Sequence, residues 1–258
     1  MPIKMIVTDL DSTLLGADST LSERTKSALA KCRAAGVKVA YATARGASAE
    51  YLVPDALVDG QIRMNGAVAR AGERIVYECL VSSRLARPLL VACNARRIKI
   101  TAELCRGSLG VYYVNEHRHI AGAPPHKQMA VVDFATHDAD YEKIFMVGLT
   151  ADDEVFVTQN LPDDLYFLMA RGDDGFGMIM HKDATKAKAT AALAAHWGIK
   201  PSEIAAFGDD LNDMDLLAYA GIGVAMGNAL DEVKDVADHV CRTNTENGVA
   251  RWLEENIL

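Results

Sequence analysis

Three short apolar segments along this chain each run directly into a cluster of polar residues. The segments lie at 3–8, 37–42 and 204–207, and the clusters lie at 9–13, 43–45 and 208–213. Short apolar runs of this kind are typical of buried strands in a parallel sheet. In an open α/β sheet, ligands bind beyond the carboxyl ends of the strands. The three polar clusters are therefore expected to converge on one crevice, although they lie far apart in the sequence.

Helix-like segments separate these strands in both terminal parts of the chain. Ser22 is suited to cap a helix that runs to Ala35, and Gly36 is suited to end it. Further helices are expected at 184–197, 213–220, 229–237 and 249–257, and further strands at 222–225 and 239–241. The segment 62–69, with Asn65-Gly66 at its centre, is expected to be a strand and a turn. This alternation predicts an α/β fold with a doubly wound, mostly parallel sheet.

The middle of the chain has a different sequence pattern, in which Gly, Pro and Asp are frequent between the expected helices and strands. Strands are expected at 111–114, 129–134, 154–158 and 166–169, and helices at 84–98 and 141–146. With 258 residues, the chain exceeds the usual size of a single domain, about 100–150 residues. We therefore predict an α+β domain at 82–181, inserted into a core formed by 1–81 and 182–258.

The overall charge limits the partners that this chain can take. A net charge of −8 argues against nucleic acid or an anionic membrane, both of which need a basic surface. A phosphorylated small molecule is compatible, because a bound divalent cation can reverse the local field. No apolar run approaches the roughly 18 residues of a membrane span, and the first residues lack the pattern of a signal peptide. The five cysteines are widely spaced, which favours free thiols and a cytoplasmic protein.

Asp9 and Asp11 lie two positions apart at the end of the first expected strand. On a continuing strand they would share one face of the pleat. One carboxylate can then attack phosphorus, while the other, held protonated, gives a proton to the leaving oxygen. Thr13 supplies a hydroxyl that can orient a carboxylate, and Thr43 supplies a hydroxyl and an N–H for phosphate oxygens. A turn or a helix cap is the alternative for each motif taken alone.

Lys186 and the cluster at 208–213 complete a set that suits phosphate and a metal ion. Lys186 lies near the start of an expected helix, where a positive charge is unfavourable against the helix dipole, so it is expected to face an anion. A solvated surface lysine is the alternative. The aspartates at 209, 210 and 213 crowd negative charge into one turn, which favours Mg²⁺ because this ion binds carboxylate and phosphate oxygens. A calcium-like or merely capped loop is the alternative.

The order of these motifs resembles that of the haloacid dehalogenase-like (HAD) phosphohydrolases, in particular the Cof-type sugar-phosphate phosphatases. The matching motifs are Asp9-Leu10-Asp11-Ser12-Thr13, Thr43-Ala44-Arg45, Lys186 and Gly208-Asp209-Asp210-Leu211-Asn212-Asp213, joined by the lesser signature Asn65-Gly66-Ala67. The resemblance implies a Rossmann-like core with an α+β cap inserted after the second motif. The chain departs from the family pattern at Ser12 and Ala44, where glycine is usual.

The resemblance also implies a role for each matching residue. Asp9 would be the nucleophile that forms an aspartyl-phosphate, and Asp11 would be the general acid and then the base. The implied cofactor is Mg²⁺, held by Asp9, Asp209 and the main-chain carbonyl of Asp11, with Asp213 beside them. The implied phosphate and substrate ligands are Thr43, Arg45, Asn65, Lys186, Asn212 and the N–H groups of Leu10 and Ala44. For Arg45, an ion pair with a nearby acid is the alternative.

These roles predict a Mg²⁺-dependent phosphoric monoester hydrolase that acts on small phosphorylated metabolites, with sugar phosphates as the expected class. A phosphomutase is the alternative within this fold, because it shares the nucleophile but returns the phosphate to the substrate. A receiver-like signalling module also phosphorylates an aspartate beside Mg²⁺, but it needs neither Asp11 nor an inserted domain. The sequence assigns neither the physiological substrate nor an oligomeric state.

Overall fold

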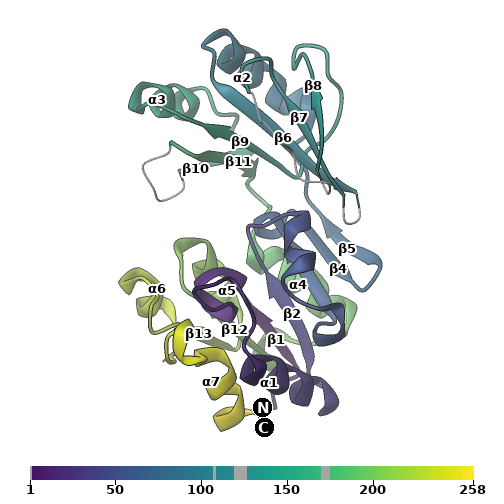
Figure 1. The fold of residues 1–258 in the computed structure, drawn as a ribbon, viewed down its shortest axis with the longest axis vertical. Helices are drawn as coiled ribbons and strands as arrows, with labels where there is room; N and C mark the ends of the chain where they lie inside the picture. Colours follow the sequence, from purple (N-terminus) through teal and green to yellow (C-terminus); the bar gives the residue numbers. More distant parts are fainter. Residues whose placement is uncertain (1, 107–108, 119–126, 170–174) are drawn as a thin grey trace. The chain divides into compact units, whose positions relative to one another are not determined.

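The chain folds into two compact units, which we call the first and the second unit. The computed structural model describes residues 2–106, 109–118, 127–169 and 175–258. The first unit combines Met1–Glu78 with Thr185–Leu258, and the second unit is Cys79–Ala184. Each unit contains a sheet of its own, as the ribbon in Figure 1 shows.

The first unit is built on an eight-stranded sheet with the order β14-β13-β12-β1-β2-β3-β4-β5. The strands are β1 (Met5–Thr8), β2 (Lys38–Ala42), β3 (Gly60–Arg63), β4 (Val68–Ala71), β5 (Arg74–Glu78), β12 (Ile204–Gly208), β13 (Ile222–Ala225) and β14 (His239–Val240). All neighbours from β14 to β3 are parallel, whereas β4 is antiparallel to both of its neighbours, β3 and β5. The predicted α/β fold with a mostly parallel sheet is confirmed.

Five helices of the first unit pack in two groups. They are α1 (Glu23–Ala34), α4 (Lys186–His196), α5 (Met214–Tyr219), α6 (Asp231–Val236) and α7 (Gly248–Asn256). Helix α1 packs against α7, and α5 packs against α4 and α6. The predicted N-cap is confirmed, since the Ser22 side chain accepts a hydrogen bond from the N–H of Thr25. Gly36, with φ of +86°, follows the end of α1 as predicted.

Strand β1 occupies the centre of this sheet, and this position determines where its polar end lies. All four residues of β1 are fully buried, as is expected for a strand covered on both faces. β1 pairs in parallel with β12 on one side and with β2 on the other. The residues that follow these three strands, Asp9, Asp209 and Thr43, therefore emerge at the same edge of the sheet.

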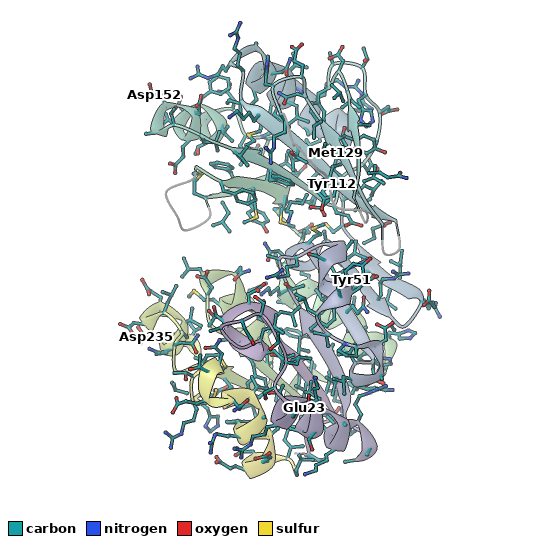
Figure 2. The ribbon with its side chains drawn as sticks, in the orientation of Figure 1. Glu23, Tyr51, Tyr112, Met129, Asp152 and Asp235 are labelled. Carbon is teal, nitrogen blue, oxygen red and sulfur yellow. The ribbon has the colours of Figure 1, made fainter. Side chains whose placement is uncertain are left out.

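In its described residues, the second unit has a six-stranded, mainly antiparallel sheet and two helices. Its strands are β6 (Lys99–Arg106), β7 (Leu109–Val114), β8 (Lys127–Val131), β9 (Lys143–Val147), β10 (Leu165–Met169) and β11 (Gly177–His181), in the order β10-β11-β9-β6-β7-β8. Its helices are α2 (Ser83–Ala95) and α3 (Ala151–Gln159). Only β7 and β8 are parallel, and their register partners Tyr112 and Met129 are labelled in Figure 2.

Two predictions in the second unit are wrong. The expected strand at 154–158 lies inside helix α3, and most of the expected helix at 141–146 lies in strand β9. The run Val155–Thr158 carries β-branched residues, but the capping box formed by Thr150 and Asp153 starts a helix before it. β9 is extended because it fills the place between β6 and β11, where Ile144 and Met146 are buried. In both places the surroundings outweigh local propensity.

Two further features concern the helices and the cysteines in the part of the chain that the structure describes. Among those residues, no helix is both long and apolar enough to cross a bilayer. The acidic side chains of Glu23, Asp152 and Asp235, labelled in Figure 2, are exposed. The cysteines at 32, 79, 93 and 241 are free thiols.

Candidate active site

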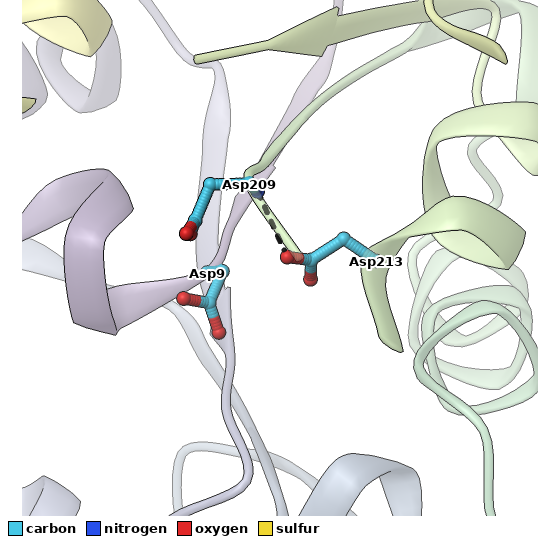
Figure 3. A group of neighbouring side chains, drawn as sticks. All are labelled: Asp9, Asp209 and Asp213. Atoms are coloured by element: carbon cyan, nitrogen blue, oxygen red, sulfur yellow. Dashed lines mark hydrogen bonds between the residues drawn. The ribbon is translucent and has the colours of Figure 1, made fainter. Parts of the chain in front are cut away.

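Three carboxylates meet at the polar edge of the first unit's sheet. Asp9 follows β1 and is only 7% exposed, while Asp209 follows β12, where the N–H of Asp9 donates to the carbonyl of Phe207. Asp213 lies one turn further along the chain and is buried. One oxygen from each of the three carboxylates lies within 4.8 Å of the others. Figure 3 shows the three side chains gathered at this edge of the sheet.

Lys186 is the buried cation of this cluster. Its Nζ donates to Asp9 Oδ1 at 2.7 Å and to Asp213 Oδ1 at 2.5 Å. The lysine is the first residue of α4, and close packing of the loop at Gly66 fixes the start of that helix. A Cβ at Gly66 would lie 2.1 Å from the carbonyl oxygen of Thr185, and the residue has a φ of +102°. Only glycine fits there, so Gly66 helps to set the position of Lys186.

Asp213 has both carboxylate oxygens engaged. Oδ1 accepts from Lys186, and Oδ2 accepts from the N–H groups of Asp209 at 3.0 Å and Asp210 at 3.2 Å. The close approach depends on Gly208, because a Cβ there would lie 2.3 Å from the Cβ of Asp213. Asp213 therefore holds the turn of Asp209 in place and pairs with the lysine.

The cluster carries more negative than positive charge. Burial raises the pKa of Asp9 to about 8, although Lys186 opposes this shift. Burial also raises the pKa of Asp209 to about 6, against a hydrogen bond from Thr13. Burial would lower the pKa of Lys186, but the neighbouring carboxylates of Asp213 and Asp9 raise it, so the lysine is charged. Three carboxylates facing one ammonium leave a deficit of positive charge.

The chain does not continue as a strand after Asp9. Residues Leu10–Leu14 form an irregular turn, in which Asp11 has an extended backbone and Ser12 has φ of +59°. The expectation that Asp9 and Asp11 share one face of a pleat is therefore wrong, because the pleat ends at β1. The turn instead brings Thr13 inward, where its hydroxyl donates to Asp209 Oδ1 at 2.6 Å.

Asp11 and Arg45 form a two-point ion pair beside the carboxylate cluster. Arg45 Nε donates to Asp11 Oδ2 at 2.7 Å, and Nη2 donates to Oδ1 at 2.6 Å. The hydrogen bonds that the guanidinium donates to Asp11 raise the pKa of Arg45. The structure therefore shows Arg45 paired with a nearby acid, one of the two alternatives that its sequence position left open.

The predicted phosphate ligands form a connected loop region at the same sheet edge. The Thr43 hydroxyl accepts from the N–H of Arg45 at 3.1 Å, and the Thr43 carbonyl accepts from the N–H of Asn65 at 2.9 Å. Asn212 Nδ2 donates to Asn65 Oδ1 at 2.9 Å, which joins the loop after β3 to the turn after β12. Leu10 and Ala44 directly follow Asp9 and Thr43 in the chain, and the phosphate contacts of their N–H groups stay a prediction.

Some residues support the site without taking part in its polar cluster, and the sequence did not reveal this role. Gly66 and Gly208 act through the absence of a Cβ, for which the only sequence signal is glycine inside a motif. Asn228 lies in a segment that also resembles the family pattern, Met226-Gly227-Asn228-Ala229, but the sequence assigned it no role. It supports the first motif, because its Nδ2 donates to the carbonyl of Ser12 at 2.8 Å and its Oδ1 accepts from the N–H of Asn244.

The donors at this site fit a hard divalent cation. They are carboxylate oxygens within 4.8 Å of one another, which suits an ion that prefers oxygen ligands, such as Mg²⁺. The raised pKa values of Asp9 and Asp209 indicate that the residues alone do not balance the charge. Because Asp213 already binds two N–H groups and Lys186, Asp9 and Asp209 have the carboxylates best able to bind the ion.

Comparison with known proteins identifies relatives over nearly the whole chain. A protein of Haemophilus influenzae named "Putative phosphatase" is 29% identical, covering 100% of this chain and 99% of that protein. A phosphatase of the haloalkanoate enzyme superfamily from Bacteroides thetaiotaomicron has a TM-score of 0.80 and 27% identity, covering 98% of this chain and 95% of that one. A sugar phosphatase of HAD subclass IIB shares the fold, with a TM-score of 0.77 and 24% identity over 99% of this chain and 100% of that one.

The family comparison agrees with the order of the motifs. Residues 6–253 match the family model described as haloacid dehalogenase-like hydrolase. That match includes every residue of the carboxylate cluster, Lys186, and the pair of Asp11 and Arg45. The resemblance seen in the sequence is confirmed, and the chain belongs to the haloacid dehalogenase-like hydrolase family.

Proposed function

We propose that this protein is a Mg²⁺-dependent phosphatase that hydrolyses small phosphate monoesters, with sugar phosphates as the substrate class. The observation that carries the proposal is the buried ion pair between Lys186 and Asp9 at the centre of a carboxylate cluster. Such a cluster binds a cation and a phosphate far better than it serves as a hydrophobic core. The phosphatase names of the relatives support the same reaction class.

In the proposed reaction, Asp9 attacks the phosphorus of the bound ester and forms an aspartyl-phosphate. Asp11 gives a proton to the leaving alcohol oxygen, and then takes a proton from the water that hydrolyses the aspartyl-phosphate. Lys186 holds the attacking carboxylate through its 2.7 Å contact and offsets charge on the phosphate. Thr43, Asn212 and the N–H groups of Leu10 and Ala44 bind the phosphoryl oxygens.

The proposed metal ligands are the carboxylates of Asp9 and Asp209 and the main-chain carbonyl of Asp11. When bound, Mg²⁺ offsets the repulsion between the nucleophilic carboxylate and the phosphate dianion. The hydrogen bond from Thr13 fixes one oxygen of Asp209 and thereby orients the other. Asp213 acts by holding Lys186 and the turn at Asp209.

We also propose a division of labour between the two units. The first unit would be the catalytic domain, because it contains every residue of the carboxylate cluster together with Lys186, Thr43 and Arg45. The second unit, inserted between β5 and α4, would be the cap domain that sets the substrate range. The phosphate is common to all substrates of phosphatases, so the residues that contact the rest of the substrate are expected to differ most between phosphatases of different specificity.

The proposal is tested with Asp9→Asn and a panel of phosphorylated metabolites. Asparagine keeps the shape of the side chain but cannot attack phosphorus, so phosphate release should fall to background. EDTA should silence the wild type, and added Mg²⁺ should restore it. Asp210→Asn is the matched control, because its side chain caps the turn through the N–H of Leu211 and an amide oxygen can do the same. Phosphate release by purified Asp9→Asn at a rate near that of the control would refute the role of Asp9.

A further inference from the structure

A thiol from the beginning of the second unit's sequence and an imidazole from near its end lie side by side. Cys79 is the first residue of this unit, and His181 is the last residue of β11, close to the end of the unit at Ala184. The Sγ atom of Cys79 lies 3.2 Å from Nδ1 of His181, although the two residues are 102 positions apart. The thiol is half-buried, and the imidazole side chain is 23% exposed, so small reagents can reach the pair.

The hydrogen bonds around His181 define which atom is the base. The N–H of Asp183 donates to Nδ1 at 3.1 Å, so this nitrogen carries a lone pair and acts as an acceptor. The S–H of Cys79 is then the donor in the thiol–imidazole contact. Oδ2 of Asp183 lies 4.0 Å from the same nitrogen and can stabilise the imidazolium that forms when the thiol proton moves. Among the described residues, Asp164 is also close enough to interact with the charge of the imidazole, and it pairs with Lys182.

The other cysteines whose side chains the structure describes have inert surroundings. Cys32 and Cys93 are buried, and burial raises the pKa of the Cys93 thiol to about 12. Cys241 is half-buried like Cys79, but its S–H points to Met226 Sδ and the carbonyl of Arg242. Burial raises the pKa of the Cys241 thiol to about 12 as well. Among the described residues, the thiol of Cys241 contacts a thioether and a carbonyl, neither of which takes up its proton. Cys241 therefore serves as an internal reference with similar exposure.

We infer that Cys79 is a modification site for peroxides and soft electrophiles, activated by His181. In the reaction with hydrogen peroxide, Nδ1 accepts the thiol proton and the sulfur attacks one peroxide oxygen. The O–O bond breaks, and the departing hydroxide takes the proton and leaves as water. The sulfur loses two electrons to the peroxide and becomes a sulfenic acid. This chemistry is independent of the proposed phosphatase reaction, which uses only residues of the first unit.

The inference is tested by labelling the folded protein with iodoacetamide at pH 7 and measuring each cysteine by peptide mass spectrometry. Cys79 should react about tenfold faster than Cys241, since a thiolate is the nucleophile and an unassisted thiol is only a few per cent ionised at this pH. His181→Asn should abolish this difference. The asparagine oxygen can still accept the N–H of Asp183, but it cannot take a proton from the thiol.

Three controls keep the test decisive. In 8 M urea, the Cys79 and Cys241 peptides should label at equal rates, which excludes a difference intrinsic to the peptides. An unchanged melting temperature of His181→Asn shows that the loss is not due to unfolding. Dimedone should trap a sulfenic acid at Cys79, and not at Cys241, after one equivalent of hydrogen peroxide. Equal rates for the two cysteines in the folded wild type, or a Cys79 rate that His181→Asn leaves unchanged, would overturn the inference.

Discussion

Lys186 shows what a single position in the sequence can and cannot reveal. A lysine at the start of a helix faces an unfavourable dipole, which pointed to an anionic neighbour. The structure gives it two such neighbours, Asp9 and Asp213, and buries it fully. Its partners could not be predicted from the residue alone, because they depend on the packing of α4 against the loop at Gly66. Lys186, Asp9 and Asp213 could be assigned to one site from the order of the motifs along the chain, and not from the residues next to each of them.

Arg45 is expected to position Asp11 for proton transfer. Its guanidinium holds both oxygens of that carboxylate, so one hydrogen bond must break when Asp11 gives or takes a proton. Arg45→Ala should lower kcat for alkyl phosphates by about tenfold, a part of the 10²–10⁴-fold that general acid–base catalysis provides. With p-nitrophenyl phosphate, whose leaving group needs no proton, the loss should be much smaller.

The test compares kcat for the two substrates in Arg45→Ala, in Arg45→Lys and in a distant control. Lysine has a single ammonium and should restore part of the loss. Arg24→Ala removes an arginine that pairs with Glu254 in the same unit, and it should leave both rates unchanged. Equal losses of kcat on both substrates would show that Arg45 binds phosphate and does not position Asp11.

Ser12 stands where the family usually has glycine, and its backbone explains that preference. The left-handed conformation at φ of +59° disfavours residues with a Cβ by roughly 1–2 kcal/mol. Ser12→Gly relieves this strain but adds freedom to the unfolded chain, worth about 0.4–1 kcal/mol. The free energy of unfolding in urea should therefore rise slightly or stay level. Ser12→Val should lower it by more than about 1 kcal/mol, since β-branched residues fit this conformation poorly; a stable valine variant would contradict this account.

At the scale of helices and strands, prediction succeeded in the first unit and failed in part of the second. The segments 3–8 and 204–207 contain the strands β1, which begins at Met5, and β12. They could be predicted because central parallel strands carry continuous apolar runs that few other elements share. The segments at 141–146 and 154–158 were assigned to the wrong type. Both are short and mixed in pattern, and their conformation follows from strand partners and from a capping box that local propensity does not contain.

We expect that Gly66 cannot be replaced without loss of stability, because its loop lies directly against the start of α4. In Gly66→Ala the new methyl group would meet the backbone of Thr185 at 2.1 Å, and backbone cannot move aside as a side chain can. We expect a loss of roughly 2–4 kcal/mol in the free energy of unfolding, and a loss of activity because Lys186 shifts.

Gly72→Ala provides the matched control for this element. Gly72 also has a positive φ, +54°, but a Cβ there would meet nothing within 4 Å. In Gly72→Ala, the free energy of unfolding should therefore fall only by the cost of a positive φ for a residue with a Cβ, about 1 kcal/mol. Urea unfolding measures the free energy of unfolding of both variants. Equal losses would mean that the contact with Thr185 does not contribute to stability.

At the scale of the whole molecule, the carboxylate cluster should couple metal binding to stability. A ligand at 100 times its dissociation constant adds about 2.7 kcal/mol, which corresponds to roughly 5–10 °C in a domain of this size. We expect Mg²⁺ to raise the melting temperature of the wild type by several degrees over EDTA. Asp209→Asn should lose most of this shift. Asp235→Asn, which removes the same charge from the exposed surface of α6, should keep it. A full shift in Asp209→Asn would exclude that residue as a metal ligand.

Acid should weaken the first unit through Asp59. Burial alone would raise the pKa of this carboxylate, but hydrogen bonds from Arg33 and from the N–H of Val39 lower it below its usual value. The carboxylate therefore stabilises the fold at pH values above its unfolded pKa, about 3.9, and this contribution is lost as the pH falls through the lower folded value.

Asp59→Asn tests this contribution directly. At pH 7 the variant should be less stable than the wild type by about 1–3 kcal/mol, because Arg33 loses a charged partner in a half-buried place. The difference should shrink below about pH 4, where the wild-type carboxylate takes up its proton. Urea unfolding at pH 7 and pH 3 measures both values, and a difference that is the same at the two pH values would contradict this assignment.

The central place of β1 has a consequence for the newly made chain on the ribosome. Its two sheet neighbours are β2, which follows soon after, and β12, which begins only at Ile204. At about 5–20 residues per second, translation takes roughly 10–40 s to reach that strand. The second unit is continuous in sequence and can fold first. Throughout that interval the edge of β1 that later pairs with β12 stays open, which exposes this edge to chaperones.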